Sequence, residues 1–273
     1  MSSSARSSVA FVIAVLALTT LVTSGRAAAH DLWMNGGSPQ SGRVQVGMAL
    51  GDDFAPEQKG HFRSDLLEAL TLHGAERSWD LLSKLQNRKP ATVSFGTTGE
   101  PLLLDLVATE QKFTLPADKF TAYAARENAA LPPVDKHKQT VSELLRRYAA
   151  IFIPGRNPSD TRLPPPTSDV LGLTLTLLDS PQLASSRLLR VRADLRGTAV
   201  PNLVLSAYRQ DAAGKASPLR SQRSDSHGVV TFAYDRKEPL LIRAWLIEPC
   251  RDACRSAEFR SYGATLTVMP QSS

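Results

Sequence analysis

Catalytic signature motifs are missing from this 273-residue chain. It contains no Gly-rich phosphate loop, no G-x-S-x-G nucleophile elbow and no H-E-x-x-H helix, and its carboxylates form no pair with a spacing suited to acid–base catalysis. Ser224, Asp225 and His227 are close in sequence, but catalytic triads are assembled from distant segments. The stretch SDSHG is better explained as a hairpin turn in which Gly228 supplies a positive φ. We therefore expect no enzymatic activity.

Long apolar runs are scarce, and the one that exists lies near the N-terminus. Arg6 is the first charged residue, and residues 9–22 (VAFVIAVLALTTLV) carry no charge. Three alanines ending at Ala29 come directly before His30. This order predicts a secretory signal peptide over residues 1–29, cleaved between Ala29 and His30. An uncleaved anchor is the alternative, but a membrane-spanning helix needs about 20 apolar residues.

The signal predicts a periplasmic or secreted location, and no later segment is apolar enough to span a membrane. Without Arg6 and Arg26, the 32 Lys and Arg residues fall to 30 against 26 Asp and Glu, a net charge of +4. This small excess is spread along the chain, whereas a nucleic-acid-binding surface concentrates basic and aromatic residues on one face. We therefore expect no membrane span after cleavage and no nucleic-acid partner.

Cysteine is also rare, because Cys250 and Cys254 in EPCRDACRSAE are the only two. In an oxidising compartment such a pair usually closes into a disulfide. A loop this short stabilises the fold by about 2 kcal/mol or somewhat more, because it removes little entropy from the unfolded chain. The alternative is a pair of thiolate metal ligands, which oxidation outside the cytoplasm disfavours.

Short segments that alternate apolar and polar residues make up most of the chain after residue 29. Gly, Pro, Asp or Asn separate them, and no long helices lie between them. This spacing predicts a mainly β fold built from antiparallel sandwiches. The predicted strands cover residues 43–50, 102–108, 171–178, 188–195, 202–209, 229–234, 240–247 and 262–269.

Two segments depart from the strand pattern. Residues 117–129 have helical composition, with Asp118 as the expected N-cap and Pro132-Pro133 after the end of the helix. The stretch TVSELLRRYAA from Thr140 is compatible with a helix or a strand, and its periodicity does not decide between them.

A Pro- and Ser-rich stretch divides the chain. Residues 154–169 (PGRNPSDTRLPPPTSD) form a stiff, exposed segment that is unsuited to sheet pairing, so we expect a linker there. The prediction is two β-sandwich, immunoglobulin-like domains: an N-terminal β-rich domain over residues 30–153, which carries the short helical excursion, and a C-terminal immunoglobulin-like sandwich over residues 170–273.

The predicted cleavage product begins with a residue that chelates metal well. The α-amine and a ring nitrogen of His30 are two donors for one ion, and the ordinary α-amine pKa of about 7.7–8.0 lets a divalent metal displace the amine proton at neutral pH. With a further imidazole, this set suits copper or nickel. The alternative is a terminal histidine without a role.

The sequence does not identify the second ligand. Imidazoles are available at His61, His73, His137 and His227, of which we take His227 as the second candidate metal residue. Asp52-Asp53 fits an acidic ligand pair or, more often, the start of a turn.

Several motifs resemble one family of periplasmic bacterial proteins with a domain of unknown function. Its members open with A-H-[DE]-x-W, as in AHDLWM at His30, and some are described as nickel or cobalt uptake accessory proteins. The likeness continues in VQVGMALGDDF (44–54), in FTLPADKFTAYAARENA (113–129) and in the strands of residues 188–269. The resemblance implies a β-rich, non-enzymatic protein that binds a transition metal, with His30 in the position of the family's first histidine.

This chain departs from the family pattern at three places. Many members carry a histidine in R-A-V-H-M, where this chain has Leu246, and a basic residue often follows the tyrosine at the position of Tyr148, where this chain has Ala149. The CRDAC loop looks like a local elaboration. If the missing histidine is a ligand in those members, metal binding here is weaker, altered or lost.

Three functional hypotheses follow. The leading one is a periplasmic accessory protein that binds nickel, cobalt or copper through His30 and passes it to an inner-membrane metal transporter. The second is a structural or adhesive β-sandwich module without a metal, and under either hypothesis Trp33 and Trp245 belong to the core. The third is a copper oxidase with a histidine brace, as in oxidative polysaccharide-cleaving enzymes, which also begin with histidine on a β-sandwich.

Mass spectrometry of the exported chain tests the cleavage site. We expect a mature N-terminus at His30, because small residues stand at the positions that signal peptidase reads before it. A first residue on either side of His30 contradicts the predicted site and removes the two-donor histidine with it.

Overall fold

The computed structural model describes residues 30–36, 42–56, 64–86, 91–97, 99–129, 131, 134–135, 137–157, 159–165, 172–182, 187–250, 254 and 256–271. These residues form a mainly β structure with one short α-helix, which confirms the predicted fold class. The predicted signal peptide, Ala29 and His61 lie outside the described residues.

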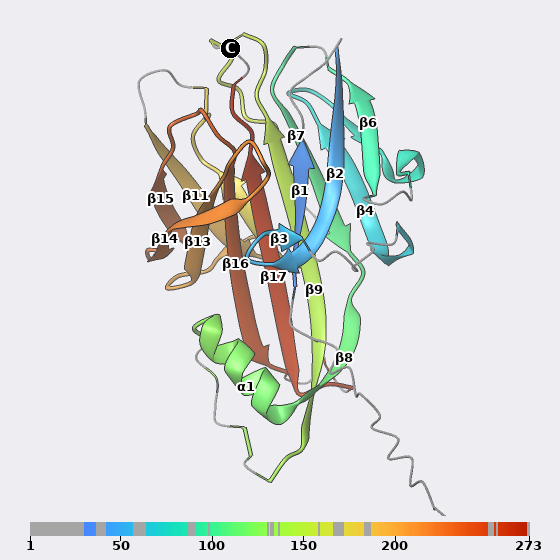
Figure 1. Ribbon diagram of the computed structural model, residues 1–273, viewed down its shortest axis with the longest axis vertical. Coiled ribbons are helices and arrows are strands. Elements are labelled where there is room, and N and C mark those ends of the chain that lie inside the picture. The colour runs from blue at the N-terminus through green and yellow to red at the C-terminus, as the bar shows by residue number, and fades with distance from the viewer. Residues whose placement is uncertain are drawn as a thin grey trace, which may run out of the picture.

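The largest sheet has nine strands and runs through the middle of the molecule (Figure 1). They are β4 (Leu67–His73), β5 (Ser78–Asp80), β7 (Leu102–Ala108), β8 (Gln111–Pro116), β9 (Thr140–Ile153), β13 (Val204–Gln210), β14 (Ala216–Arg223), β16 (Leu240–Pro249) and β17 (Phe259–Val268). Their order is β14-β13-β16-β17-β9-β7-β4-β5, and β8 pairs with the first part of β9. β17 and β9 are parallel, whereas the other pairs in this sheet are antiparallel.

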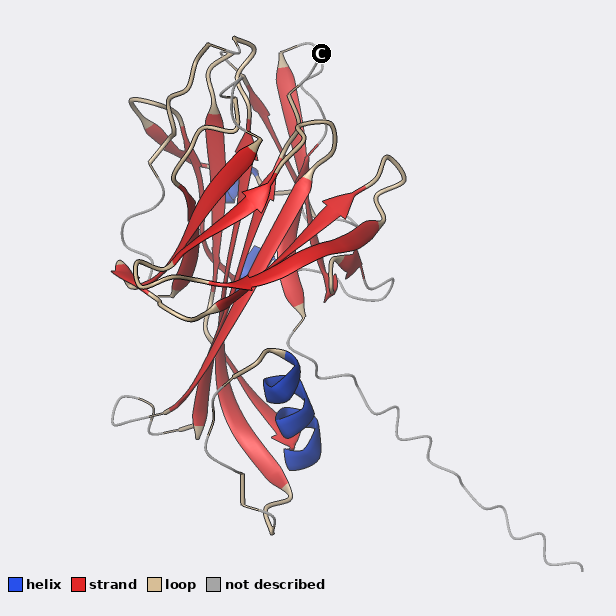
Figure 2. Ribbon diagram, turned by 90° about the vertical axis from the view of Figure 1, so that its left-hand side faces the viewer, coloured by secondary structure: helices blue, strands red, loops and turns tan. Residues whose placement is uncertain are grey.

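Two four-stranded sheets accompany the central one. The first contains β1 (Asp31–Gly36), β2 (Arg43–Asp52), β3 (Ala55–Pro56) and β6 (Thr92–Gly96). The second contains β10 (Leu173–Leu177), β11 (Leu188–Leu195), β12 (Thr198–Ala199) and β15 (Val229–Ala233). The helices are α1 (Ala117–Arg126) and two short 3-10 turns, η1 (Ser64–Leu66) and η2 (Leu82–Lys84). Helix α1 lies where the long strands β9 and β17 begin and β16 ends, at the bottom of Figure 1 (Figures 1 and 2).

Around β9, the central sheet is buried on both faces. Along β9, Tyr148 and Phe152 belong to the core shared with β10, β11 and β15, whereas Ala149 and Ile151 belong to the core shared with β1, β2 and β6. Successive side chains on a strand point to opposite faces, so a strand covered on both sides is apolar throughout. Residues 148–153 of β9 are buried at every position, whereas residues 140–146 alternate between more and less buried positions. Both patterns belong to a strand, the assignment that the periodicity of the segment from Thr140 left open.

The predicted strands are confirmed, with residues 102–108 and 188–195 matched at both ends. Helix α1 is also present, but Asp118 is not its N-cap. The helix begins at Ala117 directly after β8, Pro116 occupies the cap position, and Asp118 lies in the first turn. There its negative charge faces the positive end of the helix dipole.

The turn at SDSHG is confirmed, but the hairpin prediction was wrong. Gly228 has a φ of 74°, and the backbone N–H of His227 is bonded to the Asp225 carboxylate in an Asx turn. However, β14 before the turn belongs to the central sheet, whereas β15 after it pairs with β11. The turn therefore passes the chain from one sheet to the other.

Strands from before and after the predicted linker pair with each other in the central sheet. β17 pairs with β9 from Phe259↔Glu143 to Val268↔Phe152, which joins strands from both predicted domains. Parts of residues 154–169 are also packed, since the side chain of Gln182 bonds both the N–H and the carbonyl of Gly155. The division into two domains stays a prediction, but the two halves share one sheet.

Cys250 and Cys254 form the predicted disulfide, with their Cα atoms 5.3 Å apart. Among the described residues, no helix is both long and apolar enough to cross a membrane.

A glycine opposite a tryptophan sets the packing of β16 against β17. Gly263 is the register partner of Trp245, and a Cβ at position 263 would lie 2.7 Å from the indole ring. The ring therefore lies flat on the glycine, and only the smallest residue permits this approach.

We expect Gly263→Ala to lower the free energy of unfolding by about 1–3 kcal/mol, because the added methyl must displace a buried ring. Urea unfolding of the variant and the parent measures the change. Gly96→Ala on β6 is the control, since an added Cβ there has its nearest neighbour at 4.0 Å. An equal loss in both variants contradicts this account of Trp245.

Candidate functional site

The first strand lies against one face of the central sheet, along β17, and is attached to it through two threonines. Thr265 donates its hydroxyl to the Leu32 carbonyl at 2.6 Å, and Thr267 donates to the Met34 carbonyl at 2.7 Å. β1 also pairs with β2 along its whole length, from Asp31↔Gly51 to Gly36↔Val46. The residue at the start of β1 is therefore fixed at the interface between two sheets.

Asp31 is the most deeply buried charged group of the site. Only 1% of the residue is exposed. Its carboxylate accepts hydrogen bonds from Trp245 Nε1 at 2.9 Å, from Arg243 Nη1 at 3.2 Å and from the backbone N–H of Asp53 at 3.0 Å. Burial raises the pKa of Asp31 above its ordinary value, although Arg243 and the Trp245 hydrogen bond oppose that rise.

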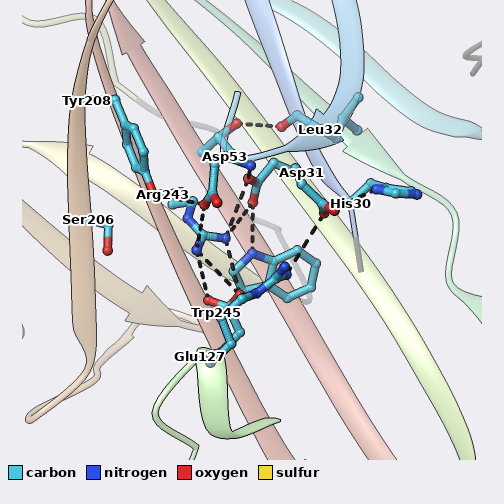
Figure 3. Close-up of polar contacts among 12 residues, drawn as sticks. His30, Asp31, Leu32, Asp53, Glu127, Ser206, Tyr208, Arg243 and Trp245 are labelled. Atoms are coloured by element: carbon cyan, nitrogen blue, oxygen red, sulfur yellow. Dashed lines mark hydrogen bonds and ion pairs between the residues drawn. The ribbon is translucent and has the colours of Figure 1, made fainter. Parts of the chain in front are cut away.

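Arg243 is the cation at the centre of the cluster (Figure 3). Its side chain is 7% exposed and contacts the carboxylates of Asp31 at 3.2 Å, Asp53 at 3.1 Å and Glu127 at 3.3 Å. Burial alone would lower the pKa of Arg243, but the carboxylates, led by Asp31 and Glu127, outweigh burial and raise it. The guanidinium therefore stays charged in the interior.

Glu127 follows α1 and connects the helix to this cluster. Burial raises its pKa, while Arg243 and Arg126 act in the opposite direction. Arg126 donates from Nε to Glu127 at 2.9 Å, and its Nη2 lies 3.9 Å from Asp52. The cluster thus joins β1, β16, the β2–β3 turn and the end of α1.

The β2–β3 turn confirms the turn reading of Asp52-Asp53 and gives both residues contacts. Asp53 and Phe54 have φ angles of 49° and 59°, which non-glycine residues adopt rarely. The bond from Asp53 N–H to Asp31 and the full burial of Phe54 hold them in this conformation. The other carboxylate, Asp52, turns toward His30.

His30 lies at the open end of the β1–β2 ladder, and 9% of it is exposed. Its Nδ1 is 3.2 Å from Asp52 Oδ1. The contact follows from the register, because Asp31 pairs with Gly51 and His30 comes next to Asp52. The structure therefore brings the predicted metal residue His30 to a carboxylate.

The other histidines occupy different surroundings. His73 is buried, with Nδ1 2.8 Å from Ser78 Oγ and Nε2 3.1 Å from Asp105 Oδ2. His137 and His227 are exposed. The backbone N–H of each donates a hydrogen bond to the carboxylate of the aspartate two residues before it, in an Asx turn. Among the described residues, no group of three or more His, Cys, Asp and Glu side chains has a geometry suited to a metal ion.

Leu246, where the resembled family carries histidine, lies on the opposite face of β16 from the cluster. Arg243 and Trp245 point toward β1, whereas Leu246 packs against the core shared with β10 and β11. A side chain at position 246 therefore faces away from the strand that carries His30.

Sequence reasoning placed Trp33 and Trp245 in the core, and both are buried. It missed Asp31, Arg243 and Glu127. The signal for Arg243 is present in the sequence, because a single charge inside the apolar strand LLIRAWLI needs a buried partner. The partner is 212 positions away, and no local pattern identifies it.

No family model matches the chain, and no curated protein matches it. Matches among solved structures include a marsupial T cell receptor, at 9% identity over 89% of this chain and 74% of that one, with a TM-score of 0.19. These comparisons assign no family. A TM-score this low carries no argument about function.

We expect Asp31→Asn to destabilise the protein by roughly 3–5 kcal/mol, because it leaves Arg243 buried with one fewer charged partner. Denaturant unfolding measures the loss. Glu110→Gln, which removes a carboxylate from the more exposed pair with Arg260, should cost about 1 kcal/mol or less. Equal effects of the two substitutions would show that burial of the Asp31 pair is immaterial to stability.

Proposed function

We propose that this chain is an exported accessory protein that binds a divalent transition metal at its mature N-terminus. Cleavage before His30 would release an α-amine beside the imidazole, and Asp52 would add a carboxylate. The donors are then two nitrogens from His30 and one oxygen from Asp52. The 3.2 Å contact between His30 Nδ1 and Asp52 Oδ1 is the observation that carries the proposal.

That contact has the length expected of two donors to one ion. Bonds from a first-row divalent metal to imidazole nitrogen and to carboxylate oxygen are about 2.0–2.2 Å long. At an angle near 90–100°, such bonds place the two donor atoms roughly 3 Å apart. The two side chains therefore need little movement to share an ion, which supports the proposal.

The donor set favours particular metals. Mixed nitrogen and oxygen ligands in a tetragonal arrangement suit nickel or copper, and cobalt binds similar sets less tightly than nickel. Three protein donors leave coordination positions open, as in sites that exchange ligands. An open position suits delivery to an inner-membrane metal transporter, the partner that the family resemblance implies.

The buried neighbours of His30 support a rigid site. Asp31 is fixed by Trp245, Arg243 and the backbone of Asp53, so the backbone on both sides of the His30–Asp52 contact is held. Donors held in place before binding lose little conformational entropy when the ion arrives.

Isothermal titration calorimetry with Ni²⁺ and Cu²⁺ on the mature protein tests the proposal. Asp52→Asn should weaken binding about tenfold or more, because it removes the only anionic donor of the set. One alanine added before His30 should weaken binding further, since the amine and the ring would no longer belong to the same residue.

His227→Ala is the matched control. It tests the alternative in which the imidazole of His227 is the second ligand. Its affinity should equal that of the parent. If the mature protein binds neither metal, the structural-module hypothesis replaces this one. A loss in His227→Ala with none in Asp52→Asn assigns the second donor to histidine instead.

A further inference from the structure

A polar pocket of about 250 Å³ opens beside Arg243. Strands β13, β14 and β16 form its floor, and the end of α1 and the β2–β3 turn form its walls. Among the described residues that line it, neither His30 nor Asp52 is present. It is thus a second site on the same charged cluster, separate from the metal donors.

The floor is a row of polar groups across three strands. Ser206 on β13 is the register partner of Arg243 on β16 and of Ser221 on β14. Adjacent strands are about 4.8 Å apart, so the backbones that carry the guanidinium and the two hydroxyls follow one another across the sheet at that spacing. The two hydroxyl oxygens are 2.8 Å apart, and Arg243 Nε is a buried donor without a hydrogen-bond partner among the described residues.

The walls add donors and acceptors of both kinds. Arg126, Glu127 and Asn128 come from the end of α1, and Asp53 comes from the β2–β3 turn. Tyr208 lies two residues after Ser206 on β13 and donates its hydroxyl to the Asp53 carboxylate at 2.9 Å (Figure 3).

The charges of the lining argue for a neutral ligand. Two carboxylates, Asp53 and Glu127, face two guanidiniums, Arg126 and Arg243. An anion would be repelled by the carboxylates, which already occupy the fork of Arg243. A cation would be repelled by the guanidiniums, and a charged ligand of either sign would have to break existing pairs.

The size and the hydrogen-bonding groups narrow the class further. Drug-sized ligands occupy pockets of roughly 300–1,000 Å³, so this pocket takes a smaller molecule. Serine hydroxyls and the asparagine amide both donate and accept, as sugar hydroxyls do. We propose that this pocket binds one ring of a neutral sugar, with Ser206, Ser221 and Arg243 contacting its hydroxyls.

Saturation-transfer NMR on the mature protein with EDTA present tests the proposal independently of metal binding. The probes are D-glucose, D-galactose, D-mannose and N-acetylglucosamine, with citrate and spermidine as charged probes. At least one sugar should bind, and neither charged probe should displace it. Binding of no sugar, or displacement by citrate or spermidine, overturns the proposal.

The Ser206→Ala/Ser221→Ala double variant locates the site. Losing two hydroxyls should weaken the affinity for the sugar about tenfold, and Ser206→Phe should abolish binding because the larger side chain fills the pocket. Ser217→Ala is the control, because it removes an exposed hydroxyl from β14 that is not part of the pocket lining. Unchanged affinity in the double variant rejects this pocket, and circular dichroism verifies that each variant is folded.

Discussion

The buried pair of Asp31 and Arg243 is the interaction on which the site depends. It joins the first strand to β16, 212 positions later in the chain, and neither side chain is more than 7% exposed. Desolvation makes a single buried charge costly, so each group requires the others. Arg243 needs three carboxylates around it, and Asp31 needs Trp245 and the Asp53 N–H in addition to the arginine.

This pair explains why the proposed metal site and the polar pocket lie next to each other. Asp31 fixes the backbone next to His30, and the β2–β3 turn that binds Asp31 also presents Asp52 and Asp53. Arg243, Asp53 and Glu127 of the same cluster also line the polar pocket. The proposed metal donors and the pocket are therefore held in place by the same charged cluster, and neither His30 nor Asp52 lines the pocket.

The sequence predicts the strands well but predicts their arrangement poorly, for a physical reason. Alternation is local, so segments such as 188–195 are identified from their own residues. The parallel pairing of β17 with β9 and the bond from Trp245 to Asp31 join residues more than 100 positions apart. In the site, His30 follows from the cleavage motif, whereas its contact with Asp52 depends on the β1–β2 register, which only the folded sheet sets.

The position of β17 has a consequence for the order in which the chain folds. β17, the last strand among the described residues, lies between β16 and β9, in the middle of the largest sheet. Until it arrives, β9 and β16 each present an unpaired edge, and the sheet exists only as two separate halves. A chain with this topology gains its cooperative core only when β17 pairs with both neighbours, so loss of this ten-residue strand disrupts both halves at once.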